Sequence, residues 1–114
     1  MPYISASPIE SSEAGRKDDQ HKPRVGLVPT TPLLDVAAVL TYGARKYDEH
    51  NWRRGIKYSR LYDAALRHLL AFIDGEDTDQ ESGLPHLAHA ACELLMLMEM
   101  GRIHPNLDDR YKKG

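Results

Sequence analysis

The sequence predicts an all-α protein, a small bundle of three main helices. Apolar residues recur at helical spacing in three stretches, no stretch shows the alternation of a strand, and Pro or Gly marks most boundaries. A chain of 114 residues fits one compact domain. We expect this domain over 24–105, after a mobile N-terminal arm rich in Ser, Pro, Lys and Asp over 1–23 and before a polar, frayed tail over 106–114.

The first helix is predicted over about 32–48. Thr31 is typical of an N-cap, and Pro32 suits the first helical position. Residues 49–58 follow as a loop, in which Gly55 is the expected turn. The apolar positions of this helix follow one face: Leu33, Val36, Ala37, Leu40 and Ala44.

The second helix is predicted from the cap Ser59 to about Asp74, with Gly75 ending it. At 100° per residue its apolar side chains form one broad face, with His68 at the edge of that face. The members of the apolar face are Leu61, Ala65, Leu66, Leu69, Phe72 and Ile73, and the opposite face holds Arg60, Asp63, Arg67 and Asp74.

The third helix is predicted from about Leu84-Pro85 to Arg102, before Pro105. It is apolar on nearly every side, so we expect it to be the central helix. Its methionines, Met96, Met98 and Met100, could instead form the seam of an oligomer.

Composition excludes several classes of protein. The formal net charge is −2 with interleaved signs, which favours neither a nucleic-acid nor a membrane partner. Cys92 is the single cysteine, so an internal disulfide and a four-cysteine zinc site are impossible, and a structural thiol is expected. The sequence shows neither a signal peptide nor an apolar run of membrane length, and we expect a cytoplasmic protein.

A candidate metal site lies on the third helix. His86, His89 and Glu93 stand at positions i, i+3 and i+7, which share an arc of about 60° among apolar neighbours. A buried carboxylate is costly unless it is paired or binds a cation, and imidazole with carboxylate suits a divalent transition metal. A polar network satisfied within the protein is the alternative.

Candidate ligand contacts lie in the loop after the first helix. Trp52 can stack on a base, Asn51 can read its polar edge, and Lys46 and Arg53 beside Tyr47 can neutralise phosphates. Alternatively, Trp52 fills the core and the cations are solvated.

Two further groups leave alternatives open. Asp63 and Arg67 could face the same cleft or form a solvated ion-paired face, and position alone favours a buried His68 over a ligand. The acidic loop over 74–81 could attract Mg²⁺ or Ca²⁺, but it lacks the order of a calcium loop and favours a solvated turn.

Several strings together resemble a phage and prophage family labelled as the N-terminal domain of dATP/dGTP diphosphohydrolases. The likeness covers about 24–100. The strings that carry it are Val39-Leu-Thr-Tyr-Gly-Ala-Arg-Lys-Tyr47, Asn51-Trp-Arg-Arg-Gly55, Ser59-Arg-Leu-Tyr-Asp-Ala-Ala-Leu-Arg-His-Leu-Leu70, Gly75-Glu76 and Glu81-Ser-Gly-Leu-Pro-His-Leu-Ala-His-Ala-Ala91.

The resemblance implies a distant relation to MazG-like all-α pyrophosphohydrolases. Those enzymes bind Mg²⁺ through Glu-x-x-Glu and Glu-x-x-Asp and direct water at the link between nucleoside monophosphate and pyrophosphate. Here His86 and His89 stand where acidic ligands are expected, and Asp63 lacks a second carboxylate three residues later. Mg²⁺ prefers oxygen ligands, so the departure indicates either a softer metal or no catalytic centre.

The first hypothesis is a metal-dependent purine deoxynucleoside triphosphate pyrophosphohydrolase in the host cytoplasm, with Mg²⁺, Mn²⁺ or Zn²⁺ as its cofactor. The second is a non-catalytic phage protein that binds a purine nucleotide or another phosphate-bearing small molecule, sequesters a signal, or regulates a hydrolase. The third is an interaction protein, and a homo-oligomer is expected. The assigned roles are catalytic for Glu93 and Asp63, metal-binding for His86, His89 and Glu93, and substrate-binding for Lys46, Tyr47, Asn51, Trp52, Arg53, Arg67 and His68.

Overall fold

The computed structural model describes residues 14–112, which form three α-helices and three short 3-10 helices. No strand occurs among these residues, although one isolated bridge joins Thr78 to Pro85. The prediction of an all-α fold with three main helices is therefore confirmed. The α-helices are α1 (Thr30–Lys46), α2 (Tyr58–Ile73) and α3 (His86–Ile103), and the 3-10 helices are η1 (Val25–Leu27), η2 (Asn51–Arg54) and η3 (Pro105–Leu107).

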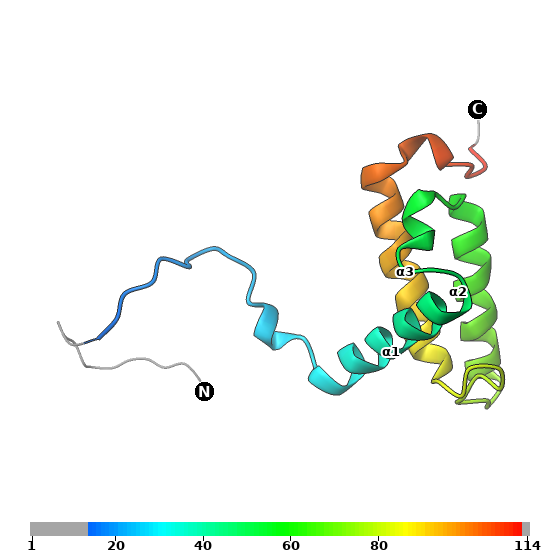
Figure 1. Cartoon of the computed structure of the whole chain (residues 1–114), viewed down its shortest axis with the longest axis horizontal. Helices are drawn as coiled ribbons and strands as arrows, with labels where there is room; N and C mark the ends of the chain where they lie inside the picture. The colour runs from blue at the N-terminus through cyan, green and yellow to red at the C-terminus, as the bar shows by residue number, and fades with distance from the viewer. Residues whose placement is uncertain (1–13, 113–114) are drawn as a thin grey trace.

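Helices α2 and α3 lie side by side, and α1 lies across them (Figure 1). Because α3 packs against both other helices, its predicted central place is confirmed. The N-terminal end of α1 projects away from the pair, together with the segment that leads into it (Figure 1). The C-terminal half of α1, and η2 after it, thus lie over the face shared by α2 and α3.

The core between α1 and α3 is built from small side chains. Val36 and Val39 of α1 pack on Ala88 and Cys92 of α3, all of them buried. Small residues at such contacts let the helix backbones approach closely. The broad apolar face expected on α2 is only partly used, because Leu61 and Ala65 are buried but Leu66, Leu69 and Ile73 are exposed.

Helices α1 and α2 begin about two residues earlier than predicted, whereas α3 begins one or two residues later, at His86. Pro29 is the N-cap of α1 in an extended conformation, so the predicted cap Thr31 lies inside the helix. Ser59 likewise lies inside α2, whose N-cap is Lys57. Neither N-cap residue makes a side-chain capping bond. The predicted caps Thr31 and Ser59 therefore lie close to the starts of α1 and α2 but are not the residues at which these helices begin.

The chain after α3 returns to the start of α2. The backbone N–H and hydroxyl of Ser59 both donate to the Asp109 carboxylate, and His104 Nε2 lies 2.8 Å from the carbonyl oxygen of Arg53. Gly55 has a φ of +120°, and a Cβ there would lie 2.7 Å from Leu107 Cδ1, so only glycine suits this turn. Residues 105–109 are thus held against the helical body, whereas 110–112 are exposed without helix or strand, and 113–114 lie outside the described residues.

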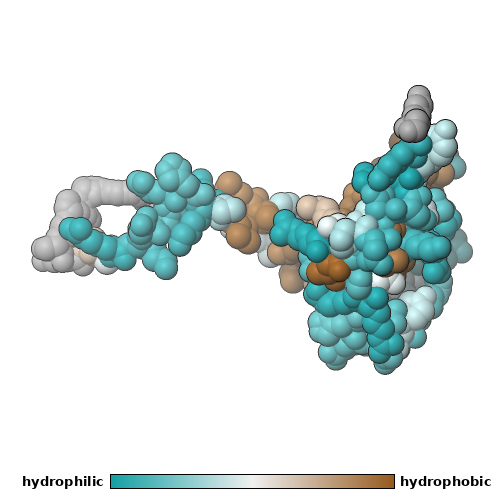
Figure 2. All heavy atoms as spheres, turned by 90° about the horizontal axis from the view of Figure 1, so that it is seen from above, coloured by the Kyte–Doolittle hydropathy of each residue, from teal (hydrophilic) through white to brown (hydrophobic). Residues whose placement is uncertain are grey.

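The N-terminal segment is described only from residue 14. Residues 14–24 are exposed and form neither helix nor strand, and residues 1–13 of the predicted mobile arm lie outside the described residues. Exposed apolar side chains occur just before α1 and in its first turns, including Val25, Leu27 and Leu34. Figure 2 shows hydrophobic surface along the narrow part of the molecule. Within residues 14–112, no helix has the length and apolar character needed to cross a bilayer.

Candidate functional site

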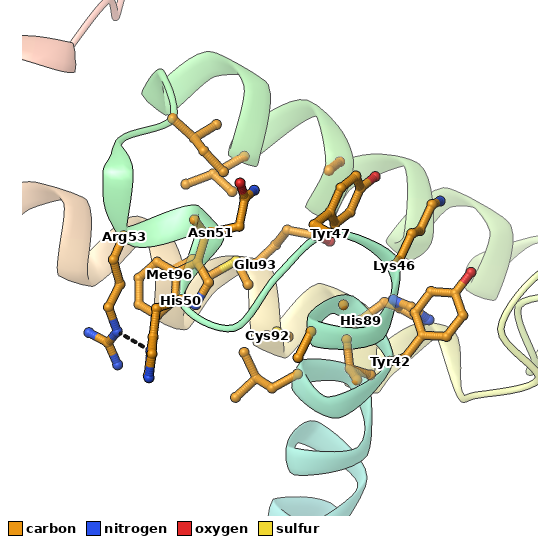
Figure 3. A pocket seen from close by; sticks show the side chains of 18 of the residues that line it. Tyr42, Lys46, Tyr47, His50, Asn51, Arg53, His89, Cys92, Glu93 and Met96 are labelled. Atoms are coloured by element: carbon orange, nitrogen blue, oxygen red, sulfur yellow. Dashed lines mark hydrogen bonds between the residues drawn. The ribbon is translucent and has the colours of Figure 1, made fainter.

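An open pocket of about 960 Å³ lies where α1, η2, α2 and α3 meet. Tyr42 and Lys46 stand at one end of this pocket, Arg53 and His50 at the other, and Glu93 of α3 between them (Figure 3). All seven residues predicted to bind substrate line the pocket, and so do two of the predicted metal ligands. These lining residues are Lys46, Tyr47, Asn51, Trp52, Arg53, Arg67, His68, His89 and Glu93.

Two predicted site residues do not line the pocket. Asp63 is exposed on α2, whereas its neighbours Arg60, Ala64 and Arg67 face the pocket. On a helical wheel Asp63 is rotated by about 100° from the centre of this pocket-facing arc, which places its carboxylate on the solvent side. His86 is buried, with 5% of its surface exposed, and lies behind the pocket wall.

The acidic loop closes one end of the pocket. Glu81 accepts a hydrogen bond from Lys46 Nζ at 2.7 Å and another from the Tyr42 hydroxyl at 2.9 Å. The bond from Lys46 lowers the pKa of Glu81 and raises that of Lys46. Glu81 is exposed, as the predicted solvated turn requires, but its carboxylate is also tied to α1.

The opposite end carries Trp52 and Arg53. The Arg53 guanidinium lies 4.4 Å from the centre of the Trp52 ring, within cation–π range. Arg53 also donates to His50 Nδ1 at 3.0 Å (Figure 3). Trp52 is half-buried and lines the pocket, so it is not fully enclosed in the core.

Three histidines from two helices form a cluster at the pocket wall, where His68 and His89 line the pocket and His86 lies behind them. His68 of α2 and His86 of α3 face one another with their Nδ1 atoms 2.8 Å apart. The ring of His89, one turn further along α3, stacks on that of His68 with centroids 4.4 Å apart. Burial lowers the pKa values of both His68 and His89, which keeps these imidazoles neutral and available as ligands.

Three carboxylates surround the histidine cluster. Glu93 Oε1 lies 4.0 Å from His68 Nε2, and Glu76 Oε2 lies 3.6 Å from His86 Nε2. Asp79 Oδ2 lies 3.9 Å from His89 Nε2. The loop between α2 and α3 thus contributes Asp79 and Glu76 to the cluster, whose histidines lie on the two helices.

Serine in the same loop fixes the position of Asp79. The backbone N–H of Ser82 donates to Asp79 Oδ2 at 2.8 Å. The Ser82 hydroxyl lies 2.6 Å from His89 Nε2. Asp79 is therefore held against the histidines by a short turn of its own loop.

Glu93 is an unpaired carboxyl on the pocket wall. Burial raises its pKa to about 7, although nearby Arg67 opposes the shift. Its Oε1 atom is buried without a hydrogen-bond partner, and so is Nε2 of His86. Buried polar atoms without partners are uncommon in proteins and point to a group that binds there.

One set of potential metal ligands comes from three different segments. Ligand atoms of His68, Asp79 and His86 all lie within 4.8 Å of one another. Of the predicted ligands His86, His89 and Glu93, this set contains only His86. Sequence reasoning placed Asp79 in an acidic loop that could attract a cation but favoured a solvated turn, and it did not join Asp79 to the histidines because a loop residue has no periodicity. The position of His68 beside the apolar face was a signal that its side chain points inward.

Comparison with known proteins identifies the family. The chain matches the family described as "dATP/dGTP diphosphohydrolase, N-terminal" over residues 12–110. It is also 41% identical over 96 residues to a dATP/dGTP diphosphohydrolase of Salmonella phage PMBT28, an alignment that covers 84% of this chain. The alignment covers 33% of that relative, so the chain spans about a third of its length. No solved structure matches significantly. The protein belongs to the family of dATP/dGTP diphosphohydrolase N-terminal domains.

Proposed function

We propose that this protein binds dATP or dGTP in the pocket and, with a divalent metal ion, hydrolyses it to monophosphate and pyrophosphate. The observation that carries the proposal is that one pocket combines cations, aromatic rings and an unpaired buried carboxylate beside a histidine cluster. The family description and the relative's name support the substrate class.

The cations of the pocket are placed to hold a triphosphate. Lys46 stands at one end and Arg53 at the other (Figure 3), and Arg67 also lines the pocket. Lys46 is paired with Glu81, but both side chains are substantially exposed, so the pair is weak. A phosphate oxygen can therefore replace Glu81 as the partner of Lys46.

The base is expected at the end that holds Trp52. The indole offers a stacking face, and Asn51 offers an amide that can both donate to and accept from a purine edge. Tyr47 is exposed nearby and can cover the ligand. Arg53 stacks on Trp52, and its guanidinium can turn toward the phosphates when a base takes its place.

Glu93 is the proposed general base. Water attacks the α-phosphorus, the bond from that phosphorus to the bridging oxygen breaks, and pyrophosphate leaves with the electron pair. The proton of the water passes to Glu93, whose carboxylate has an oxygen without a partner on the pocket wall. A divalent ion, Mg²⁺, Mn²⁺ or Zn²⁺, when bound, neutralises phosphate charge and acidifies water.

The test is a turnover assay with dATP and dGTP and each of the three metals, following pyrophosphate release. Glu93→Gln is expected to lower kcat by about 100-fold or more, because the amide cannot accept the proton. The matched control is Asp18→Asn. Asp18 is an exposed carboxyl in the N-terminal segment that does not line the pocket, so its substitution should leave turnover unchanged. An unchanged kcat in Glu93→Gln would remove Glu93 from the mechanism.

A non-catalytic nucleotide-binding module is the second candidate. It is favoured by the fact that the chain spans about a third of the relative whose name gives the activity. In this case dATP or dGTP raises Tm without any metal supporting turnover. Trp52→Ala should then abolish the rise in Tm, whereas no rise in the parent protein would leave neither function standing.

A further inference from the structure

We propose that His68, Asp79 and His86 bind a divalent transition-metal ion, with Glu93 and Glu76 as outer carboxylates that orient the two imidazoles. Only the role of the ion in turnover rests on the proposed function. Binding of the ion itself can be measured without nucleotide, so the two can fail separately.

The inner ligands come from three segments that the fold brings together. His68 stands on α2, Asp79 in the loop that follows, and His86 is the first residue of α3. Their ligand atoms lie within 4.8 Å of one another, and the Nδ1 atoms of the two histidines are 2.8 Å apart. Tetrahedral coordination of Zn²⁺ requires two ligand nitrogens to be roughly 3.3 Å apart, so a small opening of the histidine pair suffices.

The outer carboxylates define which imidazole nitrogen faces the ion. Each histidine turns Nδ1 toward the other, and each has its Nε2 opposite a carboxylate, Glu93 at 4.0 Å and Glu76 at 3.6 Å. Ligating histidines in metal sites donate their remaining N–H to a carboxylate in this way, which fixes the tautomer. When the ion takes both Nδ1 atoms, both Nε2 atoms carry hydrogen.

This tautomer also accounts for two unpaired buried atoms. His86 Nε2 and Glu93 Oε1 both lack a hydrogen-bond partner among the described residues. His86 is more than nine-tenths buried, so its unpaired nitrogen is costly. In the metal-bound form, Nε2 of His86 donates toward Glu76 and Nε2 of His68 donates toward Glu93.

The ligand set does not suit Mg²⁺, the ion that the sequence resemblance implies. Mg²⁺ demands octahedral oxygen coordination and is bound by carboxylates, phosphates and water. Two imidazoles and one carboxylate instead favour ions such as Zn²⁺, Mn²⁺ or Fe²⁺ and leave positions open for water and a phosphate oxygen. We therefore expect the protein to discriminate against Mg²⁺.

His89 has a supporting place in this arrangement. Its Nε2 atom is already engaged with the Ser82 hydroxyl at 2.6 Å, and its ring stacks on His68. It therefore positions the loop that carries Asp79 and the ring of His68. The proposed site therefore differs from the predicted set on α3 alone, which was His86, His89 and Glu93.

The experiment uses the untagged chain of 114 residues, stripped with a chelator. Zn²⁺, Mn²⁺ and Mg²⁺ are titrated by calorimetry without nucleotide, and bound metal is counted by elemental analysis. We expect one equivalent of Zn²⁺ per chain and no binding of Mg²⁺ at the same concentrations. His68→Asn and Asp79→Asn should each weaken Zn²⁺ binding by at least 100-fold, and Glu93→Gln by about 10- to 100-fold.

His21→Asn is the matched control. His21 is exposed, far from the cluster, and has a φ of +69°, which Asn tolerates well. It should bind Zn²⁺ like the parent protein. Circular dichroism of each metal-free variant verifies folding, and a Zn²⁺-dependent rise in Tm that His68→Asn loses gives a second measure of binding.

Two results would overturn the proposed site. One is absence of stoichiometric Zn²⁺ or Mn²⁺ binding to the parent protein. The other is unchanged binding in His68→Asn and Asp79→Asn together with its loss in His89→Asn. If the ion binds as proposed but no nucleotide is hydrolysed, the proposed function fails and the metal site stands. If turnover proceeds with Mg²⁺ and without ion binding at the cluster, the function stands and the metal site fails.

Discussion

Burial decides the chemistry of single residues in this protein, and Cys92 is the plainest case. Its side chain is 1% exposed in the core between α1 and α3, and burial raises the pKa of the thiol to about 11. The thiolate is the reactive form of cysteine, and here both its population and its accessibility are low. The expectation of a structural thiol is thus supported by both burial and pKa.

Alkylation of Cys92 measures this directly. At pH 8 we expect iodoacetamide to modify the folded protein at least about 100-fold more slowly than the same protein in urea, because so little thiolate forms. Mass spectrometry after timed quenching gives both rates. Equal rates in the two states would contradict a buried thiol.

Glu93 and Cys92 are adjacent in sequence, yet their roles differ. The thiol is enclosed on the side of α3 that meets α1, whereas the Glu93 carboxyl reaches the pocket wall and keeps an unpaired oxygen. The loss of turnover expected for Glu93→Gln is therefore an effect of a single side chain. One helical step separates a residue that only packs from one that we propose takes part in chemistry.

At the scale of elements, α2 is capped by a residue distant in sequence. The N–H and hydroxyl of Ser59, in the first turn of α2, both donate to Asp109 from the C-terminal segment. A carboxylate at a helix N-terminus satisfies free N–H groups and interacts favourably with the helix dipole. The tail thus serves as the cap that Ser59 was expected to supply.

This contact makes stability depend on pH. The hydrogen bonds from Ser59 lower the pKa of Asp109 below its usual value of 3.8, so they stabilise the fold at higher pH and are lost as pH falls through the folded-state pKa. Asp109→Asn should lower Tm by a few degrees at pH 7, and the difference from the parent should shrink below pH 4. Thermal denaturation followed by circular dichroism at both pH values measures it.

Asp108→Asn provides the neighbouring control. The Asp108 carboxylate bonds to Arg110 within the tail and not to α2. Its substitution should therefore change Tm less at pH 7 than that of Asp109. A larger loss in Asp108→Asn, or a difference that grows at low pH, would contradict capping of α2 by the tail.

At the scale of the whole molecule, much apolar surface stays exposed. Leu70 and Ile73 of α2 and Leu95 and Met98 of α3 are each more than half exposed. Where exposed apolar side chains form one contiguous patch, they mark a surface that binds other molecules. The predicted methionine seam needs revision, however, because Met100 is fully buried in the core and only Met98 of the three is largely exposed.

Self-association remains a prediction with a direct measurement. We expect light scattering to give a mass that is a multiple of the 12.9 kDa chain. Met98→Lys should shift the mass toward one chain, because a charge placed in an apolar contact is costly. Thr31→Lys, at an exposed position near the start of α1, should not. A single-chain mass for the parent protein would contradict the prediction.

The sequence by itself determined what depends on short-range pattern. Helical periodicity located three helices to within a few residues. Residue types alone made the stretch with Asn51 and Trp52 a candidate for ligand contacts, and both residues line the pocket. His86, His89 and Glu93 were placed on one face of α3 because i, i+3 and i+7 spacing is a property of the helix itself.

Only the tertiary structure decided which of these residues meet. The loop between α2 and α3 brings Asp79 to His68 and His86, and its course follows from turns such as the Ser82 bond to Asp79, which leave no periodic signal. The orientation of α2 turns Asp63 to solvent and His68 inward, although both lie on one helix. A cluster assembled from separate segments depends on how helices pack, and helix packing is not encoded in the spacing along any one of them.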